Sequence, residues 1–149
     1  MRYEVPRDKL IFEITESGVM LNPEVALQVL HGLRDCGIGL SVDDFGTGYS
    51  SLTQLKRMPV QELKIDQSFI RDLDDASEDS VIVRSTIEMS HSLGLKVVAE
   101  GVEFERSLQL LGRWQCDTAQ GYLISRPLAA QAFETWMAQY SHASSTLVH

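Results

Sequence analysis

Acidic residues stand at the ends of several short apolar segments, and their type and placement are typical of a metal site. The residues are Glu13, Glu16, Asp43, Asp44, Asp66, Glu100 and Glu103. Carboxylates gathered in one site repel one another unless a cation lies among them or some are protonated. Because this set contains no His or Cys, it favours hard cations such as Mg²⁺, Mn²⁺ or Ca²⁺ over zinc.

The adjacent pair Asp43-Asp44 carries most of this indication. Both acids follow an apolar segment and precede the loop Gly46-Thr47-Gly48, an arrangement that favours metal binding. The two glycines could simply permit a tight turn. Asp66 precedes a helical segment, so it could equally be a helix N-cap.

Lys64 lies inside an otherwise apolar segment, where a buried ammonium group needs a partner. It could form a structural ion pair with Glu62 or Asp66. It could also stabilise negative charge on a phosphate group or an attacking water molecule. We favour the second interpretation.

The segments that position these residues alternate between strand and helix patterns. Strands are expected at 10–14, 38–42, 62–65, 96–99 and 116–119. Helices are expected at 24–36, 80–93, 104–113 and 129–139, with a further short helix that ends at about residue 57. Repeated alternation implies parallel strands with right-handed crossovers, in an open doubly wound sheet or in part of a (β/α) barrel. The G-x-G-x-x-G motif of a Rossmann sheet is absent. In a barrel all the strand ends would meet at one face, where active sites lie.

Composition limits the classes of protein that fit. The 149 residues suit one domain, expected at 9–140 between a leader at 1–8 and a flexible tail at 141–149. The net charge of −8 argues against a binder of duplex nucleic acid. Cys36 and Cys116 form neither a metal motif nor a disulfide framework, and no apolar run reaches about 18 residues. We therefore expect a cytoplasmic protein, or the cytoplasmic portion of a membrane-anchored one.

Five motifs in order resemble the EAL domain, a family of bacterial cyclic-di-GMP phosphodiesterases with a modified TIM barrel. They are Glu13-Ile14-Thr15-Glu16, the run from Asp43 to Leu52, Lys64-Ile65-Asp66, Glu100-Gly101-Val102-Glu103 and Gln120-Gly121-Tyr122. The resemblance extends over about residues 9–139. It implies a partial TIM-type barrel of about five parallel strands with alternating helices, without the N-terminal strands.

The resemblance also implies roles for the acidic residues. Glu13 and Asp43 resemble metal ligands, and Asp44 resembles the ligand of a second metal ion. Asp66 resembles a neighbouring metal or water contact. Glu16 resembles the residue that holds the loop from Asp44 to Leu52, which in the family couples substrate and metal binding to dimerisation.

The remaining roles concern catalysis. Lys64 resembles a lysine near the attacking water, and Glu100 resembles an essential glutamate regarded as a general base or a metal-site residue. Glu103 and Gln120 resemble a supporting acid and a polar contact. The implied reaction opens one phosphodiester of cyclic-di-GMP to give linear pGpG, with Mg²⁺ or Mn²⁺ and two ions in the complete domain.

Some expected features of the family are absent. The Glu-Ala-Leu signature is missing, as is an Asn ligand on the strand before the Glu-x-Thr-Glu strand. A complete barrel needs ~250 residues. We therefore expect the C-terminal part of an EAL domain, with upstream EAL and sensory or GGDEF regions outside this chain, inactive alone and prone to self-association.

Two other functions fit the residues less well. A degenerate EAL-like module would bind nucleotide or protein without catalysis, and the retained acids and Lys64 weigh against it. A metal-dependent barrel acting on an enolisable carbonyl compound is disfavoured by the Asp-Asp-Phe-Gly-Thr-Gly run.

Overall fold

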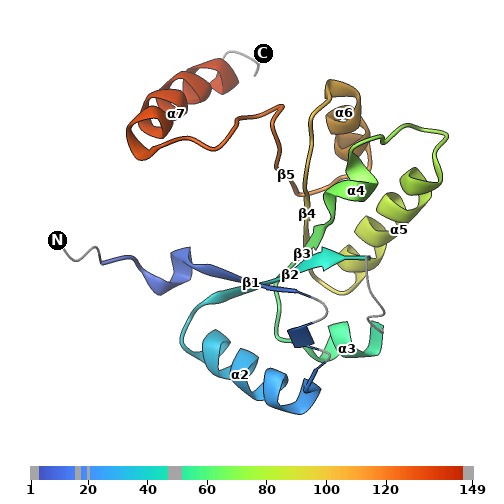
Figure 1. Ribbon diagram of the computed structural model, residues 1–149, viewed down its shortest axis with the longest axis vertical. Helices are drawn as coiled ribbons and strands as arrows, with labels where there is room; N and C mark the ends of the chain where they lie inside the picture. Colours follow the sequence, from blue (N-terminus) through green and yellow to red (C-terminus); the bar gives the residue numbers. More distant parts are fainter. Residues whose placement is uncertain (1–3, 16–17, 20, 47–51, 146–149) are drawn as a thin grey trace.

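The computed structural model describes residues 4–15, 18–19, 21–46 and 52–145, with side chains as far as Tyr140. Strands and helices alternate along this part of the chain (Figure 1). The strands are β1 (Ile11–Thr15), β2 (Gly39–Phe45), β3 (Glu62–Ile65), β4 (Lys96–Ala99) and β5 (Thr118–Ala119). The helices are the 3-10 turn η1 (Arg7–Lys9), α2 (Pro23–Asp35), α3 (Leu52–Arg57), α4 (Gln67–Ile70), α5 (Glu78–Ser92), α6 (Glu105–Arg113) and α7 (Ala130–Ser145).

The sheet has the topology of a barrel wall. Every strand pair is parallel, and the spatial order β1-β2-β3-β4-β5 is the order along the chain. A doubly wound sheet would reverse its strand order at a switch point, and these strands show no reversal. Figure 1 shows α2, α3, α5 and α6 along one side of the strands. The predicted α/β class and partial (β/α) barrel are therefore confirmed.

The two faces of the sheet differ sharply in chemistry, because successive side chains of a strand point to opposite faces. The apolar set packs against the helices, with Leu63, Val97, Ile87 of α5 and Leu111 of α6 almost fully buried. The opposite set includes Glu13, Ser41, Asp43, Lys64 and Val98. Glu13 pairs with Ser41 across β1 and β2, Lys64 pairs with Val98 across β3 and β4, and Asp43 follows Ser41 by two residues. Charged residues therefore lie on the face away from the helices, which corresponds to the inside of a barrel.

Helix ends agree only partly with the sequence patterns. Helix α2 begins at Pro23, one residue before the expected start at 24, and Asn22 precedes it as an N-cap residue whose side chain makes no capping hydrogen bond. Helix α7 continues to Ser145, so residues 141–145 of the expected tail are helical. Neither Gly nor Pro interrupts α7, and its alanines favour continued helix.

Across the described residues, no helix combines the length and apolarity that a membrane span requires.

Strand β5 is shorter than the expected 116–119 because a side chain replaces part of its backbone pairing. The amide N–H of Val97 in β4 donates to Oδ2 of Asp117 at 2.8 Å rather than to a carbonyl of β5. The same oxygen lies 2.8 Å from Nε2 of His91 in α5. Asp117 therefore joins α5, β4 and β5 at the end of the sheet opposite the acidic residues.

We expect Asp117→Ala to lower the free energy of unfolding by about 1–3 kcal/mol, because the buried Val97 amide loses its acceptor. Burial acts to raise the pKa of Asp117, but hydrogen bonds from His91 and Val97 outweigh it and hold the pKa below its usual value. The stabilisation that the ionised Asp117 carboxylate gives the folded state should be complete above about pH 4. It should disappear as the pH falls through the lowered folded-state pKa of Asp117.

Urea denaturation at pH 7 and pH 3 measures both effects. Asp117→Asn is the matched control, since it keeps an oxygen for the Val97 amide and should lose less stability at pH 7. Equal stability of the Ala variant and the wild type at pH 7 would contradict the assignment.

Candidate metal centre

An irregularity in β2 presents two consecutive acids at the same end of the sheet. The expected strand at 38–42 in fact runs to Phe45, so Asp43 and Asp44 lie within it rather than after it. Pairing with β3 shifts register between Val42 and Phe45, and Asp44 has a φ of 56°. A bulge re-aims side chains while the strand continues. The neighbouring acids therefore need not point to opposite faces, as they would in a regular strand.

Lys64 joins three carboxylates from three separate segments. Its side chain is 6% exposed, and its Nζ lies 2.7 Å from Oε1 of Glu13, 2.7 Å from Oε1 of Glu100 and 3.2 Å from Oδ1 of Asp43. Glu13 lies in β1, Asp43 in β2, and Glu100 directly after β4. The sequence interpretation named Glu62 and Asp66 as its structural partners, and this pairing is wrong. Residues two positions apart along a strand share a face but lie about 6.6 Å apart, whereas neighbouring strands are only about 4.8 Å apart, so residues of adjacent strands reach Lys64 more easily.

These contacts determine the charge state of Lys64. Burial acts to lower its pKa, but the hydrogen bonds to Glu100 and Glu13 and the contact with Asp43 more than compensate. The pKa of Lys64 is therefore raised well above its usual value. Lys64 is a permanent cation at neutral pH.

Asp44 and Asp66 form a second group beside the first. Burial raises the pKa of Asp44, and the negative charges of Asp43 and Asp66 raise it further. Asp66 accepts hydrogen bonds from the backbone N–H of Ser68 at 2.9 Å and from its hydroxyl, so it is the N-cap of α4. Burial acts to raise the pKa of Asp66, but these bonds and a hydrogen bond with Asp44 outweigh it and hold the pKa below its usual value. Asp66 is thus a cap that also contacts the acidic cluster.

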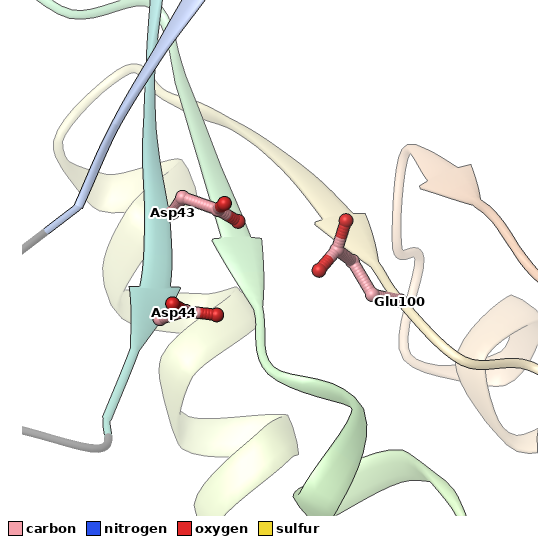
Figure 2. A group of neighbouring side chains, drawn as sticks. All are labelled: Asp43, Asp44 and Glu100. Atoms are coloured by element: carbon pink, nitrogen blue, oxygen red, sulfur yellow. The ribbon is translucent and has the colours of Figure 1, made fainter.

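The cluster fits a divalent cation. Oxygen atoms of Asp43, Asp44 and Glu100 all lie within 4.8 Å of one another. Figure 2 shows Asp43 and Asp44 projecting from β2 and Glu100 from the end of β4, all toward the space over β3. Oδ1 of Asp43 is buried, and although it lies 3.2 Å from Nζ of Lys64, no described residue gives it a hydrogen bond of good geometry. A carboxylate oxygen left in this state is suited to a hard cation.

A cleft adjoins the cluster on the side of β5. It has a volume of about 310 Å³ and is lined by Gln67, Arg71, Glu100, Gly101, Glu103, Gln120, Gly121 and Tyr122. Sequence reasoning selected Glu100, Glu103 and Gln120, and the structure places all three together in this cleft. It missed Gln67, the first residue of α4, and Arg71, the residue after its end, whose i, i+4 spacing puts them on one side of this helical turn. That spacing was the available signal.

Two glycines allow the segments around the cleft to approach closely. Gly101 has a φ of 70°, and a Cβ there would lie 2.5 Å from Cβ of Gln67. At Gly121 a Cβ would overlap the backbone of Val102. Val102 donates its N–H to the carbonyl of Gln120 at 3.0 Å, so this contact also positions Gln120.

We expect Gly121→Ala to displace or unfold the segment that carries Gln120, because backbone atoms cannot yield as a flexible side chain can. The loss should be about 1–3 kcal/mol or more, the typical cost of overpacking. Thermal melts beside a Gly112→Ala control test this, since a Cβ at Gly112 meets nothing within 4 Å. A Gly121→Ala variant as stable as the control would contradict the close contact.

Glu16 and the loop residues 47–51 lie outside the described residues, so the expectations for them stay predictions. The other predicted site residues are placed as above. Glu13, Asp43, Lys64 and Glu100 form one ion-pair group, Asp44 and Asp66 adjoin it, and Glu103 and Gln120 line the cleft.

Comparisons with known proteins identify the family of this chain. The family model described as the EAL domain matches residues 1–127. The chain is 45% identical over 131 residues to the bifunctional diguanylate cyclase/cyclic di-GMP phosphodiesterase MucR of Pseudomonas aeruginosa, covering 88% of this chain and 19% of MucR. It is 46% identical to the cyclic di-GMP phosphodiesterase NbdA of the same organism, covering 88% of this chain and 17% of NbdA.

Solved structures show the same fold. A c-di-GMP complex of the PaMucR phosphodiesterase superposes with a TM-score of 0.82 at 46% identity, covering 85% of this chain and 56% of that one. A manganese/cy-diGMP complex of Klebsiella pneumoniae BlrP1 gives a TM-score of 0.76 at 36% identity, covering 83% and 31%. The chain spans about a fifth of the length of MucR and NbdA. Because the EAL family model matches most of the chain, and because the fold and these relatives agree with it, the chain belongs to the EAL domain family.

Proposed function

We propose that this chain supplies most of the acidic site of a cyclic-di-GMP phosphodiesterase, which hydrolyses cyclic-di-GMP to pGpG when the domain is complete. The observation that carries the proposal is the convergence of Glu13, Asp43 and Glu100 on Lys64, with Asp44 beside them. MucR is a bifunctional diguanylate cyclase/cyclic di-GMP phosphodiesterase and NbdA a cyclic di-GMP phosphodiesterase, and their identity to this chain supports the same substrate.

Glu13, Asp43, Asp44 and Glu100 would hold Mg²⁺ or Mn²⁺, with Asp66 contacting the same cluster. Bound ions of this kind activate water and stabilise negative charge on a phosphodiester. Asp43 and Asp44 are adjacent acids aimed at one space, which supports a two-ion site in the complete domain. The manganese and calcium complexes of BlrP1 support a divalent cation in this fold.

The chain's own residues would orient the substrate. The cleft places Arg71 and Gln67 of the α4 region beside Glu100, and Tyr122 and Gln120 at its other side. Arg71 offers a cation for a phosphate oxygen, and Gln67 and Gln120 offer amide hydrogen bonds. Glu103 would orient polar groups at the rim. The free cysteines Cys36 and Cys116 support action in a reducing cytoplasm.

A chimaera tests the function directly. The part of the MucR EAL domain that precedes the matched region is fused to this chain, and pGpG formation is followed with Mn²⁺ and Mg²⁺. We expect metal-dependent release of pGpG. Tight binding of cyclic-di-GMP with no product would instead favour a degenerate module that binds without catalysis.

A further inference from the structure

We propose that Lys64 is an internal counter-ion that holds the carboxylates of the metal-free site together and weakens metal binding by occupying their shared space. The inference rests on the proposed metal site. It assigns Lys64 a positioning role in the metal-free protein, in addition to any contact with substrate or water.

Geometry carries the first step. Lys64 is buried in the middle of the sheet, whereas Lys9, Lys56 and Lys96 are exposed. Its ammonium contacts oxygens of Glu13, Asp43 and Glu100, and Asp43 and Glu100 are also two of the three residues whose oxygens lie within 4.8 Å of one another. The ammonium and a divalent ion would therefore use the same acids.

Electrostatics carries the second step. Without a cation the carboxylates would repel one another and spread apart or take up protons. One ammonium offsets part of that charge and holds residues from three segments in place. Its positive charge also repels an incoming divalent ion at short range, where the interaction is strong. Removing the ammonium should therefore destabilise the metal-free protein and strengthen metal binding.

Calorimetric titration with Mn²⁺ of the full chain tests this, comparing Lys64→Met with Lys96→Met. The control loses the same charge from the exposed start of β4, at the other end of the sheet. We expect Lys64→Met to bind Mn²⁺ about tenfold more tightly or better, which corresponds to ~1.4 kcal/mol, and the control to change by less than about twofold. The metal-free melting temperature should fall only for Lys64→Met, and Mn²⁺ should restore it. Unchanged or weaker Mn²⁺ binding by a folded Lys64→Met would overturn the proposal.

A measurement on the wild type covers the case in which Lys64→Met does not fold. In protein labelled with ¹⁵N at the lysine ammonium groups, we expect one signal protected from exchange in the metal-free state. Saturating Mg²⁺ should shift that signal and speed its exchange, while the exposed lysines stay unchanged. A signal that does not respond at saturation would overturn the inference.

These outcomes can be distinguished from failure of the proposed function, because neither metal titration nor the lysine signal uses cyclic-di-GMP. Absence of Mg²⁺ and Mn²⁺ binding to the wild type at millimolar concentration would overturn both the metal site and the role of Lys64. Metal binding of the expected pattern without pGpG formation by the chimaera would overturn only the proposed phosphodiesterase function.

Discussion

Asp43→Asn in the completed chimaeric domain is expected to lower cyclic-di-GMP hydrolysis about a hundredfold or more. Asp43 contributes a buried oxygen that is paired with the Lys64 ammonium at 3.2 Å but accepts no hydrogen bond of good geometry from the described residues. Asp43 also lies beside Asp44 and Glu100. The amide keeps the shape but removes the negative charge that a divalent ion requires. Substitutions of groups that merely support metal ligands cost about 10–100-fold, so a ligand should cost at least as much.

The measurement is pGpG formation at a series of Mn²⁺ concentrations, with Asp35→Asn as the control. Asp35 is an exposed carboxylate at the end of α2, paired with Arg34 at 2.9 Å, and lies outside the cluster. Its replacement should leave turnover within about twofold, as for most exposed ion pairs. Full activity of Asp43→Asn at low Mn²⁺ would remove Asp43 from the metal centre.

This chain without the rest of a domain is expected to self-associate and to release no measurable pGpG. Within the described sheet β1 pairs only with β2, and β5 only with β4, so both edges offer unpaired backbone groups. Ile11 and Phe12 of β1 are 55% and 45% exposed. Phe133, Met137 and Tyr140 of α7 are also exposed. Such edges and apolar surface favour pairing with another copy.

Sedimentation velocity over a range of concentrations, with a parallel hydrolysis assay, measures both properties. The chimaera should sediment as a defined species and reach ordinary turnover, on the order of 1–10³ s⁻¹. It differs from the chain alone only in the added segment, so it serves as the matched comparison. A monomeric chain that hydrolyses cyclic-di-GMP at such rates by itself would show that the added strands are not needed.

Sequence patterns predicted the strands and helices that depend on local chemistry. Gly37 and Gly94 end α2 and α5 with φ of 82° and 76°, as glycines after a helix do. The strands at β3 and β4 were predicted with their observed bounds, because short apolar runs between turn residues leave little choice. The start of β5 was missed because the Asp117 side chain takes over a backbone bond, which depends on a partner 20 residues away.

The sequence alone determined that five acids stand near the ends of strands that alternate with helices, and therefore share one end of a parallel sheet. They are Glu13, Asp43, Asp44, Asp66 and Glu100. Only the tertiary structure decided which of them meet. The register of β1, β2, β3 and β4 places Glu13, Asp43 and Glu100 around Lys64, and the bulge at Val42–Phe45 turns Asp44 toward Asp66. Register and bulges arise from pairing between segments far apart in the chain, and a shift of one residue would send each side chain to the other face. The sequence of a single segment therefore does not determine its register with another strand.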